Sequence, residues 1–149
     1  MVTLSDESRA AILEAEKSGD FGKPGYQDAI SEFYSKYVCR METWPECMND
    51  AVAGMGEEVY NYVYGPSEFT VTGTLKGYDL SPRLSEIEIP VLLPCGEYDE
   101  ATPETTSFYA SKFRNATVRV FEDASHEHHL EKTVKYIQEV RSFLDRIEN

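Results

Sequence analysis

The chain has 149 residues, a length typical of one domain and sufficient to bury a moderate hydrophobic core. Its 27 Asp and Glu residues outnumber its 14 Lys and Arg residues, and the resulting net charge of −13 argues against partners that need basic patches, namely nucleic acid and anionic membranes. A hydrophobic content of 41% with 12% aromatic residues is typical of a globular protein rather than a disordered one.

The three cysteines, Cys39, Cys47 and Cys95, are odd in number and widely spaced, so they match neither a disulfide framework nor a CxxC motif. The first residues lack the basic and apolar regions of a signal peptide, and no apolar run approaches the length of a membrane span. We therefore expect a reduced, cytoplasmic protein without a membrane segment.

Four short helices are predicted in the first part of the chain, over residues 5–18, 26–38, 45–53 and 57–64. Ser5 is placed to cap the first of them, and Gly19 is suited to end it in a left-handed conformation. Pro45 fits the first position of the third helix, where its missing N–H costs nothing. Such a helical layer without an evident strand is typical of a cap that covers another part of a protein.

From residue 69 the pattern becomes that of an α/β protein. We expect a β-prone segment or loop over 69–75, a helical turn over 83–87, parallel strands near 90–96 and 116–122, a crossover helix over 103–115 and a closing helix over 131–147. The apolar run Val91–Leu93 favours a strand that is covered on both faces and has neighbours on each edge. Two or three strands do not provide those neighbours, so the sequence is expected to form the C-terminal portion of a larger α/β fold.

Two loops at the carboxyl ends of the predicted strands carry candidate catalytic residues. Asp99 follows the first strand and His126 follows the second. Because the carboxyl ends of neighbouring parallel strands lie side by side, the two residues are expected to approach each other. A carboxylate fixes the tautomer of a neighbouring imidazole, which can then accept a proton from a nucleophile. Taken alone, His126 would more often be an exposed loop histidine, and Asp99 shifts the interpretation towards catalysis.

The same loop is rich in residue types that bind metals: His126, Glu127, His128, His129 and Glu131. However, an HExxH motif would need a histidine where Leu130 stands, and one loop rarely supplies the three or four ligands of a zinc site. No metal or organic cofactor is implied. A serine nucleophile is not evident either, because the sequence lacks G-x-S-x-G, and Cys39 and Cys47 are predicted to lie on helices without a nearby base.

Several segments resemble proline iminopeptidases (prolyl aminopeptidases), which are serine peptidases with the α/β-hydrolase fold. They are Phe33–Tyr34, Val38–Arg40 and Trp44–Glu46, similar to the lid helices; Gly65–Leu75, similar to the segment after the lid; Ile89–Pro103, similar to the acid-bearing strand and loop; and Ser125–Glu131, similar to the histidine loop. The resemblance implies that residues 1–68 form a helical lid and residues 69–149 the C-terminal part of an α/β-hydrolase core.

The resemblance also implies residue roles, with Asp99 as the acid of a catalytic triad and His126 as its general base. Glu68 and Glu100, together with Tyr60, would bind the free α-amino group of the substrate through charge-assisted hydrogen bonds. Without the resemblance, Glu68 would be interpreted as a surface or helix-end carboxylate and Glu100 as a first-turn charge of the following helix.

The leading hypothesis is that the chain is the C-terminal portion of a proline-iminopeptidase-like serine hydrolase. When a nucleophile-bearing N-terminal half completes it, the enzyme would release N-terminal proline or another apolar residue from peptides. A different amine-bearing substrate, such as an amino-acid amide or ester, fits the same residues. The alternative is a non-catalytic binding or assembly module, which pairs with a missing half or with a copy of itself through an exposed sheet edge.

Overall fold

The computed structural model describes residues 4–67 and 70–148. They form two compact units, which we call the sheet unit and the helical unit. The sheet unit consists of Phe33–Met41 and the chain from Leu80 onward, whereas the helical unit consists of the preceding residues up to Glu32 and of Glu42–Asp79. Within the described residues, no helix combines the length and the apolar character needed to cross a membrane.

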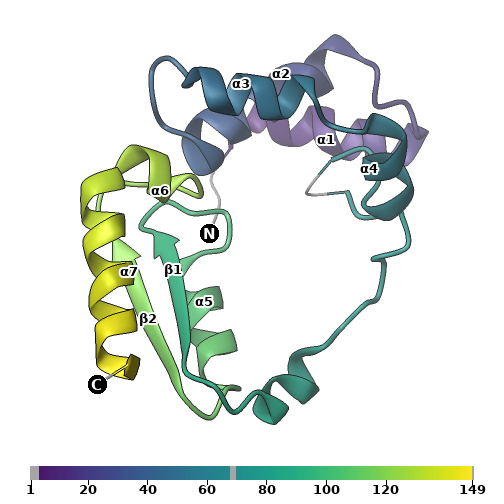
Figure 1. Ribbon diagram of the computed structural model, residues 1–149. Helices are drawn as coiled ribbons and strands as arrows, with labels where there is room; N and C mark the ends of the chain where they lie inside the picture. The colour runs from purple at the N-terminus through teal and green to yellow at the C-terminus, as the bar shows by residue number, and fades with distance from the viewer. Residues whose placement is uncertain (1–3, 68–69, 149) are drawn as a thin grey trace. The chain divides into compact units, whose positions relative to one another are not determined.

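The sheet unit contains two parallel strands, β1 (Val91–Gly96) and β2 (Ala116–Phe121), paired from Val91 opposite Ala116 to Gly96 opposite Phe121. Helix α5 (Pro103–Ala110) connects them and contacts both (Figure 1). The hydroxyl of Thr102 caps this helix by accepting a hydrogen bond from the Thr105 N–H. The predicted α/β class with strands near 90–96 and 116–122 is confirmed, although α5 ends five residues before the expected boundary at 115.

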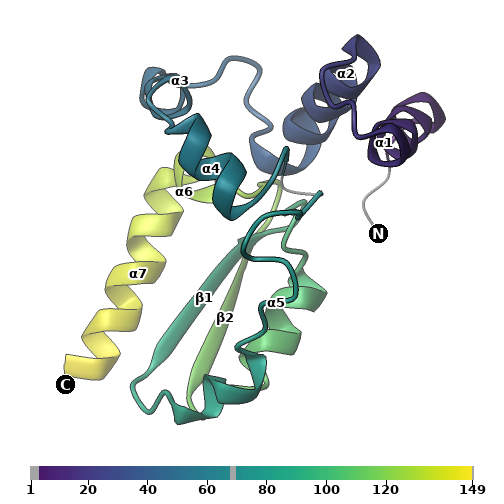
Figure 2. The same ribbon diagram turned by 90° about the vertical axis from the view of Figure 1, so that its right-hand side faces the viewer.

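The last part of the chain forms two helices, α6 (His128–Glu131) and α7 (Thr133–Glu148), where the sequence predicted one helix over 131–147. Lys132 separates them because its backbone has the non-helical angles φ −130° and ψ 44°. Helices α5 and α7 lie on opposite sides of the two strands (Figures 1 and 2). Four apolar side chains of α7 remain exposed: Val134, Ile137, Leu144 and Ile147.

The helical unit is built from four helices, of which the second ends at the boundary between the units: α1 (Asp6–Ser18), α2 (Pro24–Phe33), α3 (Glu46–Ala53) and α4 (Glu57–Val63). Ser5 caps α1 as predicted, accepting a hydrogen bond from the Ser8 N–H, and Gly19 ends the helix with φ 72°. Pro45 precedes α3 as its cap instead of being its first residue, since its ψ of 152° is extended.

The remaining segments are short. A π-helical turn, η1 (Tyr34–Val38), follows α2 directly, and a 3-10 helix, η2 (Ser81–Glu86), precedes β1. The described residues of the predicted β-prone segment, 70–75, form a loop instead of a strand. The N–H groups of Thr72 and Gly73 both donate to the Tyr64 carbonyl at the end of α4, which holds this loop in place. The assignment of residues 1–68 to a lid and of 69–149 to a hydrolase core stays a prediction.

Candidate active site

Asp99 lies in the loop that follows β1, and its side chain is only 3% exposed. Its carboxylate accepts hydrogen bonds from the backbone N–H of Gly96, with N···Oδ2 at 3.1 Å, and from that of Ala101, with N···Oδ1 at 2.9 Å. Two backbone donors on different oxygens hold the carboxylate in one orientation. The loop therefore fixes the direction of Asp99 independently of its side-chain partner.

The loop that follows β2 brings His126 to Asp99. A hydrogen bond from the Tyr98 N–H to the Ala124 carbonyl joins the two loops at 2.9 Å. The Nδ1 atom of His126 lies 3.0 Å from Oδ1 of Asp99, which is hydrogen-bonding distance. Since an ionised carboxylate only accepts, Nδ1 carries the hydrogen, and Nε2 of the neutral ring is left as the proton acceptor.

The pair shifts the pKa values of both residues in the directions expected of an ion pair. Burial by itself would raise the pKa of Asp99, but the hydrogen bonds from His126, Ala101 and Gly96 outweigh it, so this pKa lies below its ordinary value. The hydrogen bond to Asp99 raises the pKa of His126 to about 9, against the opposing effect of burial, and the charges of Glu100 and Glu127 add to the increase.

Glu100 is the second carboxylate beside His126. Its Oε1 atom lies 4.0 Å from Nδ1 of His126, and its side chain is 22% exposed, so it remains accessible at the edge of the Asp99–His126 pair. The resemblance to proline iminopeptidases implied that Glu100 is a ligand of the substrate's amino group. The structure places it next to the proposed base, on the loop that also carries Asp99, and its binding role stays a prediction.

His128 lies close to Asp99, whereas sequence reasoning considered it only among the metal-binding residue types. Its Nδ1 atom is 3.9 Å from Oδ2 of Asp99, and its ring stacks on Phe121 with the centroids 5.1 Å apart. This Nδ1 is buried without a hydrogen-bond partner among the described residues. Burial lowers the pKa of His128 and is only partly countered by the charge of Asp99 and by the backbone of Ser125 and His126. His126 and His128, two residues apart, therefore have pKa values displaced in opposite directions.

Tyr60 and Glu68 are the other two residues that the resemblance implied as ligands of the amino group. Tyr60 lies on α4 in the helical unit, where its ring stacks on Tyr64 with the centroids 5.5 Å apart. Glu68 lies outside the described residues. The predicted roles of Tyr60 and Glu68 in binding an amino group therefore stay predictions.

The metal-binding residue types and two of the three cysteines can be placed in the described residues. Within them, no group of three or more His, Cys, Asp and Glu side chains is arranged to hold a metal ion. Cys39 and Cys95 are buried free thiols, and burial raises the pKa of both, which disfavours the reactive thiolate. The prediction that Cys39 lies on a helix is wrong, because Cys39 follows the π-helical turn in an extended conformation.

No protein-family model matches the chain, but several known enzymes are similar to it in sequence. A proline iminopeptidase of Heyndrickxia coagulans is 37% identical over 137 residues, which cover 91% of this chain and 48% of that enzyme. A proline iminopeptidase of Saccharolobus solfataricus is 32% identical over 145 residues, covering 97% of this chain and 47% of that enzyme. The chain spans about half the length of the curated relatives it matches and corresponds to their C-terminal part.

Solved structures agree with the sequence comparison. The crystal structure of proline iminopeptidase from Mycobacterium smegmatis matches with a TM-score of 0.84 and 39% identity, covering 96% of this chain and 48% of that one. The crystal structure of VinJ matches with a TM-score of 0.89 and 27% identity, covering 97% of this chain and 49% of that one. The fold is therefore that of the C-terminal half of α/β-hydrolase proteins, as the resemblance implied.

Proposed function

We propose that this chain, a homologue of the C-terminal part of proline iminopeptidases, supplies the acid and the base of a serine hydrolase of that kind. The observation that carries the proposal is the 3.0 Å contact between Nδ1 of His126 and Oδ1 of Asp99, at the carboxyl ends of two paired parallel strands. In this proposal a serine, presented by a nucleophile-bearing half, completes the triad.

The proposed chemistry follows from the two ring nitrogens of His126. Asp99 holds Nδ1, so in the neutral ring Nε2 takes the proton of the serine hydroxyl while the serine oxygen attacks the substrate's carbonyl carbon. The same proton then passes to the leaving amine as the C–N bond breaks, which leaves an ester between the acyl group and the serine. Nε2 next takes a proton from a water whose oxygen attacks the ester carbonyl, and that proton returns to the serine oxygen as the acyl group leaves as a carboxylic acid. Asp99 stays ionised throughout and stabilises the imidazolium, a role that its low pKa supports.

The proposed substrate is a peptide or amino-acid amide with a free N-terminal amine, and proline is the preferred first residue by analogy with the relatives. Glu100 supports this part because its carboxylate stands beside His126, where it could bind an ammonium group close to the reacting carbonyl. Glu68 and Tyr60 are proposed to assist it from the segment assigned as the lid. The net charge of −13 is compatible with a cationic substrate, although such an excess more often serves solubility.

Reconstitution tests the proposal directly. The upstream half of the Heyndrickxia coagulans relative, which contributes the nucleophile in this proposal, is produced with this chain as a separate or fused partner. We expect hydrolysis of prolyl aryl amides and labelling by a fluorophosphonate, which needs an activated serine. Glu100→Gln should raise KM for a free-amine substrate more than for an N-acetylated one. A complex that associates but neither turns over nor labels would contradict the proposal.

A second candidate is a non-catalytic assembly module, favoured by the apolar surface of the sheet unit. Val134 on α7 is 72% exposed, and Ile89 before β1 is 71% exposed. Such surfaces tend to bind a partner or a second copy. Size-exclusion chromatography with light scattering tests this candidate. A chain that stays monomeric as its concentration is raised would count against self-association.

For either function we propose a cytoplasmic location, which the three free cysteines support.

A further inference from the structure

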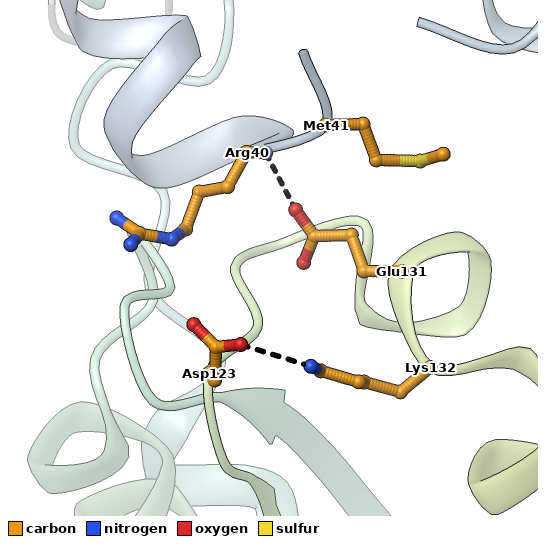
Figure 3. Close-up of a pocket in the computed structure, with 5 residues that line it drawn as sticks. All are labelled: Arg40, Met41, Asp123, Glu131 and Lys132. Atoms are coloured by element: carbon orange, nitrogen blue, oxygen red, sulfur yellow. Dashed lines mark hydrogen bonds and ion pairs between the residues drawn. The ribbon is translucent and has the colours of Figure 1, made fainter. Parts of the chain in front are cut away.

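The carboxylate of Glu131 gathers three donors near the proposed base. Its Oε2 accepts from the backbone N–H of Ser125 at 2.5 Å, and its Oε1 lies 2.8 Å from the Ser125 hydroxyl. The same Oε1 accepts from the backbone N–H of Arg40 at 2.5 Å (Figure 3). Ser125 is fully buried and immediately precedes His126. Glu131 therefore joins the histidine loop to a segment some 90 residues earlier in the chain.

That earlier segment, residues 37–40, binds the histidine loop along its backbone. The N–H of His126 donates to the Tyr37 carbonyl at 3.1 Å, and the N–H of Glu127 donates to the Val38 carbonyl at 2.8 Å. The Ser125 hydroxyl also lies 2.9 Å from the Val38 carbonyl. Both backbone bonds start at or next to His126, so the position of segment 37–40 sets the position of the proposed base.

The same segment also contacts the loop that carries the acid. The guanidinium carbon of Arg40 lies 4.1 Å from the centroid of the Tyr98 ring, a cation–π geometry, and Tyr98 immediately precedes Asp99. Segment 37–40 thus touches both catalytic loops, with Glu131 bonded to its Arg40 N–H on one side and to Ser125 on the other.

We propose that Glu131 is a positioning residue, which holds the His126 loop against segment 37–40 and thereby keeps His126 in register with Asp99. Glu131 does not touch the reacting atoms, so its action is indirect. An ionised carboxylate suits the task because all three partners are donors. A glutamine has one acceptor oxygen in place of two, so it would turn an NH2 group towards one of these donors and lose that hydrogen bond. The inference adds a residue to the proposed function, and its catalytic meaning rests on that proposal.

The test uses the full chain alone, so that it does not depend on reconstituted activity. Glu131→Gln is compared with the wild type and with the control variant Asp123→Asn. Glu131 and Asp123 line one pocket (Figure 3), but the Asp123 side chain is 76% exposed and pairs with Lys132. Asparagine also tolerates the φ of 51° at position 123. Two quantities are measured by NMR: the pKa of His126 and the hydrogen-exchange rates of the His126 and Glu127 amides.

With Glu131→Gln, we expect the pKa of His126 to fall from about 9 towards its ordinary value of 6.5, because the loop no longer holds the ring at Asp99. The His126 and Glu127 amides should exchange about tenfold faster, while amides of β1 and β2 keep their rates. Asp123→Asn should change neither quantity. Wild-type values of both in Glu131→Gln would overturn the inference.

If Glu131→Gln does not fold, Glu131→Asp decides, because it keeps the charge but shortens the side chain that bonds Ser125 and Arg40, and it must accelerate exchange at His126 for the inference to stand. An ordinary pKa for His126 in the wild type would instead count against the Asp99–His126 pair, and so against the proposed function. In that case the exchange rates of the His126 and Glu127 amides would still test whether Glu131 holds the His126 loop.

Discussion

Gly96, the last residue of β1, packs against the backbone of Ser125 so closely that a Cβ at position 96 would lie 2.3 Å from the Ser125 carbonyl oxygen. It would also lie 2.4 Å from the carbonyl oxygen of Ala124. Both distances are shorter than any ordinary contact, and both involve backbone atoms that side-chain rotation cannot move. The loops of Asp99 and His126 therefore approach each other only because residue 96 has no side chain.

This close approach predicts that Gly96→Ala destabilises the chain. The added methyl group forces the two loops apart, and overpacking of this kind costs about 1–3 kcal/mol of unfolding free energy. Gly22→Ala is the matched control, because its Cβ would meet only the Asp20 carboxylate at an ordinary 3.6 Å. Urea unfolding of both variants measures the difference, and equal stability of the two would contradict the packing described here.

A second prediction concerns the titration of His126. Its folded-state pKa is raised to about 9, so the stabilisation by Asp99 is fully present below pH 6.5 and is lost as the pH rises through about 9. Asp99→Asn should return the pKa of His126 towards 6.5 in an NMR titration. It should also remove the alkaline loss of stability, and a pKa of His126 that stays near 9 in Asp99→Asn would refute the assignment.

His128 should behave in the opposite way. Burial lowers its folded-state pKa, so its contribution to stability is present above pH 6.5 and is lost as the pH falls through that lowered pKa. His128→Phe keeps an aromatic ring against Phe121 and has no nitrogen to protonate. We expect the variant to lose less unfolding free energy than the wild type between about pH 7 and pH 5. An equally steep loss in urea titrations would show that His128 is not responsible.

The positions of Asp99 and His126 could be predicted because they depend on a local rule. The apolar runs that become β1 and β2 are readable in the sequence, and loops at the ends of parallel strands meet. A similar local rule placed Ser5 as the cap of α1. These features depend on neighbours in sequence or on one crossover connection.

The supports of the site could not be predicted in this way. Glu131 binds Arg40 across a separation of 91 residues, and no periodicity or motif relates these two positions. Sequence reasoning placed Glu131 among the metal-binding residue types, in the histidine-loop segment and at the start of the closing helix, and assigned it no supporting contact. The segment 69–75 was ambiguous between a strand and a loop for a different reason. A Cβ at Gly73 would lie 2.4 Å from the Val63 carbonyl oxygen. This close packing against the end of α4 is a tertiary contact that strand propensity does not reveal.

The central claim is that His126 is the base of a serine hydrolase, and the most direct measurement compares two histidine variants in the reconstituted enzyme. His129 lies in the same stretch, is similarly exposed and pairs with Glu127, not with Asp99, which makes His129→Ala the matched control. We expect His126→Ala to lower kcat/KM for a prolyl aryl amide by at least roughly 10³-fold, while His129→Ala stays close to the wild type. Unchanged turnover with His126→Ala would contradict the account.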